Sequence, residues 1–207
     1  MIFITSKIIL YLTQVVALLV AIKHWNAIKN TSQKYFLHFM CYVVLHETSV
    51  IVLRYIFDIK IEILNNGFTI ISFLFYYWWY HKILKRRKII YVLLLIFIAS
   101  FSASLMLEDL NKLWKYPLIT GTFSILILVS ILFSEILRDI TAVNYLKSQK
   151  FWFSTGLLIF YIGFLPVLYF QNVVDTKSSH YGLIMAFLNV LLYGSFIIGF
   201  LCPPQKK

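Results

Sequence analysis

The sequence predicts an all-α, polytopic membrane protein whose seven transmembrane helices form one domain over residues 1–207. The first observation behind this prediction is the composition: 61% of the 207 residues are hydrophobic and only 13% are charged, whereas soluble domains carry about 25% charged residues. The second is a series of apolar stretches of about 20 residues, the length that crosses the hydrocarbon core of a bilayer. Together these observations exclude a soluble domain and a disordered chain.

The expected spans are continuous apolar runs separated by short polar connections. A run such as Tyr91–Ala99 shows no alternation of polar and apolar residues, so it predicts a helix rather than a strand of a membrane barrel. The connections are too short to hold a soluble domain, and any activity must therefore lie between the helices or on short loops. The seven expected spans are Ile4–Ile22, Tyr35–Phe57, Ile63–Tyr80, Ile89–Leu107, Pro117–Leu137, Phe151–Phe170 and Tyr181–Leu201.

Each of the first three spans has a recognisable feature. The first is followed by a positive cluster that begins at Lys23, whereas a signal peptide has its charge before the apolar core, so we expect this span to be retained. The second contains ionisable residues that are expected to lie inside the membrane. In the third, Asn65, Asn66 and Gly67 mark the outer end, and the aromatic segment Phe75–His81 closes the span just before a basic run.

The last four spans differ in how closely they are expected to pack. The fourth contains the continuous apolar run Tyr91–Ala99, and the fifth opens with small and polar residues at Pro117–Ser124. The sixth carries Gly156 and Gly163. Small residues let helix backbones approach closely in a bilayer, so the fifth and sixth spans are expected to make close contacts. The seventh ends just before Cys202.

The distribution of Lys and Arg predicts the orientation, because cytoplasmic loops carry an excess of them. Loops one, three and five and the C-terminal tail hold 13 of the 19 basic residues: Lys23, Lys29, Lys34, Lys82, Lys85, Arg86, Arg87, Lys88, Arg138, Lys147, Lys150, Lys206 and Lys207. The other side holds Lys7, Lys60, Lys112, Lys115 and Lys177, together with the acidic Asp58, Glu62, Glu108, Asp109 and Asp175. The N-terminus is therefore predicted outside and the C-terminus in the cytoplasm.

This topology accounts for the net charge of +11 without a nucleic-acid partner, and the same cations can contact anionic lipid. The contact surface for a partner or for lipid is expected at Lys82, Lys85, Arg86, Arg87 and Lys88. Tryptophan favours the headgroup layer, so all five are expected at span ends: Trp25, Trp78, Trp79 and Trp152 at the cytoplasmic side and Trp114 at the outer side.

Ionisable side chains inside a span are costly and are functional candidates by default. His46 and Glu47 lie at the midpoint of the second span, and Arg54 follows Glu47 by seven residues. Seven residues correspond to about 700° of rotation, so Glu47 and Arg54 share a face of the helix. Arg54 is expected to extend to the outer headgroups. For Glu47 a structural hydrogen bond and a proton-, ion- or ligand-binding role both remain open.

Two amides lie at a similar depth in other spans. Gln14 is near the middle of the first span and Asn189 near the middle of the seventh. If the first, second and seventh spans are neighbours, these amides could join His46 and Glu47 in one buried polar network. Such a network could be packing glue between helices or a binding pocket, and the sequence leaves both open.

No motif for catalysis or for a cofactor is found. His46-Glu47 begins like a zinc-protease motif, but Val50 stands where the second histidine should be. Neither a metal site nor a catalytic cluster is expected, so we predict no cofactor and no enzymatic activity. Cys41 lies inside a span and Cys202 at a cytoplasmic end, so no disulfide is expected. Acylation of Cys202 is the alternative to a small buried side chain.

A family resemblance adds to this picture. The stretch Phe151–Phe170 resembles a recurring sixth-span sequence in small seven-helix membrane proteins of Bacteroidota. The resemblance extends back through Glu135–Lys150, forward over Leu188–Gln205, and to the Asn65-Asn66 start of the third span. Because such proteins often occur near sensor histidine kinases, the resemblance implies a signalling accessory in the bacterial inner membrane with a kinase as candidate partner. Glu47 lies outside the shared pattern.

The function predicted from the sequence is a non-enzymatic membrane sensor, signalling accessory or complex subunit. It would act on a membrane or cytoplasmic protein partner through basic loops three (Lys82–Lys88) and five (Arg138–Lys150). The alternative is a small-solute or proton-coupled transporter in which Glu47 carries the proton.

Overall fold

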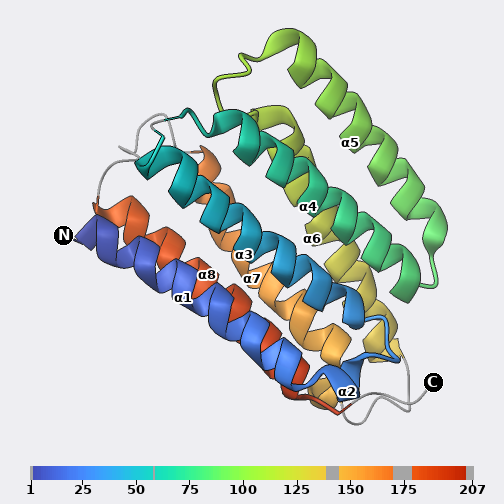
Figure 1. The fold of residues 1–207 in the computed structure, drawn as a ribbon. Coiled ribbons are helices and arrows are strands. Elements are labelled where there is room, and N and C mark those ends of the chain that lie inside the picture. Colours follow the sequence, from blue (N-terminus) through green and yellow to red (C-terminus); the bar gives the residue numbers. More distant parts are fainter. Residues whose placement is uncertain (1, 58, 139–144, 170–178, 204–207) are drawn as a thin grey trace. The chain divides into compact units, whose positions relative to one another are not determined.

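The computed structural model describes residues 2–57, 59–138, 145–169 and 179–203 (Figure 1). In these ranges all regular secondary structure is helical, as predicted. The elements are α1 (Ile2–Lys23), α2 (Trp25–Ile28), α3 (Lys34–Tyr55), α4 (Glu62–Ile83), α5 (Arg87–Leu107), α6 (Lys115–Arg138), the short 3-10 helix η1 (Tyr145–Lys147), α7 (Gln149–Tyr169) and α8 (Ser179–Leu201).

Each of the seven expected spans lies on one long helix. The second expected span runs two residues past the end of α3, and Phe170, the last residue of the sixth, falls outside the described residues. The two short helices α2 and η1 were not predicted. Both lie in connections that were expected to be irregular, and each is too short to show a hydrophobic period.

Five of the long helices are long and apolar enough to cross a membrane: α3, α5, α6, α7 and α8. The described apolar part of α1 is shorter, from Ile8 to Lys23. α4 has 22 residues, but Asn65, Asn66 and its Tyr- and Trp-rich second half make it less apolar than the five. These helices indicate a multi-pass membrane protein.

The described chain forms two compact units. Unit 1 contains residues 1–44 and 132–207, and unit 2 contains residues 45–131. In unit 1, α8 packs against both α1 and α7. Figure 1 shows α1 and α8 side by side and running in the same direction.

The α7–α8 contact depends on glycine. A side-chain carbon on Gly156 would lie 2.9 Å from the Leu192 carbonyl oxygen, and one on Gly199 would lie 2.9 Å from the Phe153 ring. The space beside Gly199 is thus occupied by an aromatic ring. The close approach expected from Gly156 is therefore found, and its partner helix is α8.

An aromatic cluster forms the core of unit 1 near the N-terminus of α7. Phe36 of α3 stacks on Phe153 of α7, with ring centroids 4.3 Å apart. Phe196 and Phe200 of α8 contact the Phe153 ring edge-on, at 5.5 and 5.0 Å. All four side chains are fully buried. They bring three helices together through large apolar surfaces and favourable ring geometry.

Unit 2 is organised around α4, α5 and α6, with the second half of α3. The Phe73 ring of α4 lies against Gly121 of α6 and is 5.5 Å from the Phe97 ring of α5. Ser100 of α5 and Thr120 of α6 share a hydrogen bond of 2.7 Å. Each of these three helices therefore contacts the other two.

The tryptophans at the expected span ends differ in their burial. Trp25 and Trp78 are exposed. Trp79 and Trp114, however, are buried inside the protein, Trp79 completely. The sequence gives the height of a residue along a helix, but in a helix that is apolar on all sides it does not give the direction of the side chain.

Candidate functional site

The predicted site residues fall in both units. Gln14 and Asn189 belong to unit 1, and His46, Glu47 and Arg54 belong to unit 2. The single buried network of Gln14, His46, Glu47 and Asn189 therefore stays a prediction.

The central polar group of unit 1 joins α1 to α8. The Gln14 amide nitrogen donates a hydrogen bond of 3.3 Å to the Tyr193 hydroxyl oxygen. Gln14 is only 2% exposed, and its carbonyl oxygen Oε1 is buried without a hydrogen-bond partner. An amide oxygen in this position costs free energy until a donor reaches it. The Gln14 Oε1 atom is therefore a candidate acceptor for a hydrogen bond from a bound molecule.

The amide nitrogen of Asn189 bonds within its own helix and not to Gln14. Its Nδ2 donates to the carbonyl oxygen of Met185, one turn earlier in the same helix, at 2.8 Å. Tyr193, which the sequence analysis did not assign to the site, is the observed partner of Gln14. The available signal was its position four residues after Asn189, which places both residues on one face of α8.

His46 and Glu47 lie in the middle of α3 with different surroundings. The buried His46 ring stacks on Phe68 of α4, with centroids 4.1 Å apart, and is hydrogen-bonded to the Asn65 side chain. Glu47 is partly exposed, and Arg54 is exposed near the end of α3. His46 is thus a packing contact between α3 and α4, whereas Glu47 and Arg54 face outward to a larger extent.

A basic surface closes one end of unit 2, at the turn between α4 and α5. Its members are Lys82, Lys85, Arg86, Arg87 and Lys88, and all five side chains are exposed. Unit 2 has four described carboxylates, and none of them lies in this turn: Glu47, Glu62, Glu108 and Asp109. The turn itself is held by a 2.9 Å hydrogen bond between the His81 ring nitrogen Nε2 and the Tyr91 hydroxyl.

The opposite end of unit 2 is closed by hydrogen bonds that the sequence analysis did not predict. The Asn66 side chain donates to the Lys112 carbonyl oxygen at 2.8 Å and accepts from the Trp114 backbone N–H at 3.0 Å. The Glu108 carboxylate accepts from the Lys115 backbone N–H at 2.9 Å, where α6 begins. Both side chains thus replace bonds that the backbone cannot make in a turn or at a helix start.

Asp109 lies in the same turn, outside the expected spans. The backbone N–H of Asn111 donates to its carboxylate at 2.9 Å and holds the pKa of Asp109 below its usual value. Lys112 and Lys60 lower that pKa further through their positive charge. This end of unit 2 therefore carries mixed charges with local partners.

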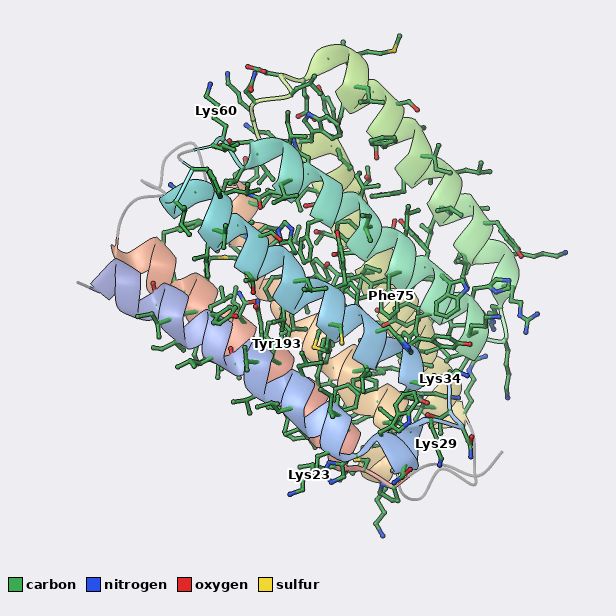
Figure 2. The ribbon with its side chains drawn as sticks, in the orientation of Figure 1. Lys23, Lys29, Lys34, Lys60, Phe75 and Tyr193 are labelled. Atoms are coloured by element: carbon green, nitrogen blue, oxygen red, sulfur yellow. The ribbon has the colours of Figure 1, made fainter. Side chains whose placement is uncertain are left out.

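Unit 1 also has a basic end, at the junctions of α1, α2 and α3. Figure 2 shows Lys23, Lys29 and Lys34 gathered there. The nearby η1 segment is fixed by two bonds to the Leu146 carbonyl oxygen: the Trp152 indole N–H donates at 2.7 Å and the Cys202 thiol at 3.7 Å. Part of predicted loop five, residues 139–144, lies outside the described residues.

No protein-family model, no curated protein and no solved structure matches this chain.

Proposed function

We propose that the chain crosses the bacterial inner membrane seven times, with α1 and α4 added to the five most apolar helices. With 22 residues, α4 is about 33 Å long at 1.5 Å per residue, enough for the hydrocarbon core. Its outward side chains Ile63, Ile71 and Leu74 are apolar and exposed. α1 packs along α8, one of the five, and exposes Leu12 and Leu19. Both helices thus present lipid-compatible faces.

The proposed orientation places the N-terminus outside and the C-terminus in the cytoplasm. In unit 2 the basic surface, Lys82 to Lys88, lies where α4 ends and α5 begins, whereas the described carboxylates of the connections lie where α4 and α6 begin and α5 ends. This asymmetry supports a cytoplasmic α4–α5 turn, because positive residues are retained on the cytoplasmic side.

Within this topology, the proposed function is a non-enzymatic signalling accessory or subunit of a membrane complex. The observation that supports it is the exposed basic surface with no described carboxylate in its turn. Such a surface attracts an acidic partner over a distance set by the Debye length. The partner class that the family resemblance suggests is a sensor histidine kinase. The short connections favour a protein that passes a signal to a partner through direct contact over an enzyme.

The test is gentle extraction of the tagged full chain from native membranes, followed by mass spectrometry of what co-purifies. We expect one stoichiometric protein partner, lost when Arg86→Glu and Arg87→Glu are combined and retained in Lys60→Glu. Lys60 is a matched control because it is an exposed cation just before the other end of α4. If the wild-type chain purifies alone as a monodisperse particle, the proposal that it is a subunit of a membrane complex loses its support.

A transporter is the second candidate, and Glu47 is the observation that favours it. It is an ionisable group in the middle of a helix apolar enough to cross the membrane, and it is partly exposed. In this proposal Glu47 carries the proton, with His46 next to it on the same helix. Proton-driven uptake into proteoliposomes should then vanish in Glu47→Gln and persist in Ser49→Ala, an exposed neighbour on α3. Equal uptake by both variants would exclude this role for Glu47.

A further inference from the structure

One exposed stripe of α4 changes character in a regular way along the helix. Ile71, Leu74, Trp78 and Lys82 lie within about 80° of each other around the axis, given 3.6 residues per turn. The first three are each at least 39% exposed, and Lys82 is exposed as well. The stripe, here called the α4 stripe, therefore passes from aliphatic to aromatic to cationic on one outward face.

The length of the α4 stripe matches one leaflet. From Ile71 to Lys82 the helix rises by about 16 Å at 1.5 Å per residue, and half of the hydrocarbon core is about 15 Å. Ile71 lies close to the midpoint of α4, which runs from Glu62 to Ile83. Lys82 is then at headgroup depth, and Trp78 lies just below it, where tryptophan is favoured.

The cation of the α4 stripe is held in place. Lys82 Nζ lies 5.6 Å from the centre of the Trp78 ring, within the range of a cation–π contact. The His81–Tyr91 hydrogen bond of 2.9 Å links the same end of α4 to α5. Next to it are Lys85, Arg86, Arg87 and Lys88, which raise the positive potential.

We propose that the α4 stripe is a binding site for one anionic phospholipid. Its acyl chain lies along Ile71 and Leu74, its glycerol region contacts Trp78, and its phosphate pairs with Lys82. A lipid fits this surface better than an acidic protein does, because the apolar part of the stripe continues directly from the cation into the predicted bilayer. The inference depends on the proposed placement of α4 in the membrane and is independent of the signalling role.

The test is lipid binding to the purified full chain in neutral detergent, measured by native mass spectrometry with phosphatidylglycerol and phosphatidylcholine. We expect a preference for phosphatidylglycerol. Lys82→Ala should lower that affinity about fivefold, because one cation near an anionic surface contributes about 1 kcal/mol. Lys82→Arg should keep it, and Lys60→Ala should leave it unchanged. Trp78→Ala should weaken both lipids alike. Size-exclusion profiles establish that each variant is folded.

Three outcomes would overturn the proposal: equal retention of both lipids by the wild type, equal effects of Lys82→Ala and Lys60→Ala, or displacement of bound lipid by glycerol 3-phosphate, which lacks acyl chains. The last result would identify a simple anion site. A variant Lys82→Ala that loses lipid but still captures the protein partner separates this site from the proposed function.

Discussion

Replacing Gly156 by alanine tests the close contact between α7 and α8. A side-chain carbon at this position would lie 2.9 Å from the Leu192 carbonyl oxygen and 2.9 Å from Cβ of Ser195. Neither atom can rotate away, since one belongs to the backbone and the other is fixed by it. The helices must therefore move apart. Gly194 provides the matched control, because nothing lies within 4 Å of a side-chain carbon built there.

The magnitude follows from two opposing terms. Alanine is favoured over glycine inside a helix by about 1 kcal/mol, and this gain is common to both variants. An added methyl group in a packed contact costs about 1–3 kcal/mol, and this cost applies to Gly156→Ala alone. The free energy of unfolding should therefore be about 1–3 kcal/mol lower for Gly156→Ala than for Gly194→Ala. Gly194→Ala itself should equal or exceed the wild type.

The assay is thermal unfolding of the purified chain in mild detergent, followed by tryptophan fluorescence and circular dichroism. For a chain of this size about 1 kcal/mol corresponds to about 2–4 °C in Tm. Gly194→Ala should therefore melt about 2–12 °C above Gly156→Ala. Equal melting temperatures would refute the conclusion that α7 and α8 touch through Gly156.

Three further variants test the ends of the helices. Asn66→Ala should lower the free energy of unfolding by about 1–3 kcal/mol, because the buried Trp114 N–H and the part-buried Lys112 carbonyl lose their partner. Hydrogen exchange at the Trp114 amide should then accelerate, and an unchanged rate would contradict the bond. Glu108→Ala should cost about 1 kcal/mol and speed exchange at the Lys115 amide, whereas Glu108→Gln, which keeps an acceptor, should cost less. Burial raises the pKa of the Cys202 thiol, so in a Cys41→Ala background it should react with iodoacetamide at pH 8 more slowly than glutathione does. A rate equal to that of glutathione would show an accessible thiol.

The positions of the long helices could be predicted because length and composition alone decide them. An apolar run of about 20 residues has few alternatives to a helix, since its backbone groups must bond to each other away from water. The match is good even for α4, in which Asn65 and Asn66 interrupt the apolar sequence. The short helices α2 and η1 carry no such signal, because one turn is fixed by local contacts such as the Trp152–Leu146 bond.

The partners of the polar residues could be predicted much less well. The depth of Gln14 was evident, but its bond to Tyr193 depends on α1 lying beside α8. Asn66 was recognised only as the start of a span, although its side chain holds the Lys112 and Trp114 backbone. In both cases the missing information is which helices are neighbours and which side of each is turned inward. A sequence that is apolar on all sides does not encode this as a period.

The two ends of unit 2 differ in a way that bears on the proposed role. At one end, Asn66 and Glu108 form hydrogen bonds with backbone groups of the same unit, so these polar side chains are satisfied within the unit. At the other end, Lys82 to Lys88 expose their charges, and none of the described carboxylates lies in the turn. Five exposed cations in one short segment raise the positive potential of that end, which attracts anionic groups. A binding surface is therefore expected at the α4–α5 turn, and the lipid and partner experiments test its two proposed contacts separately.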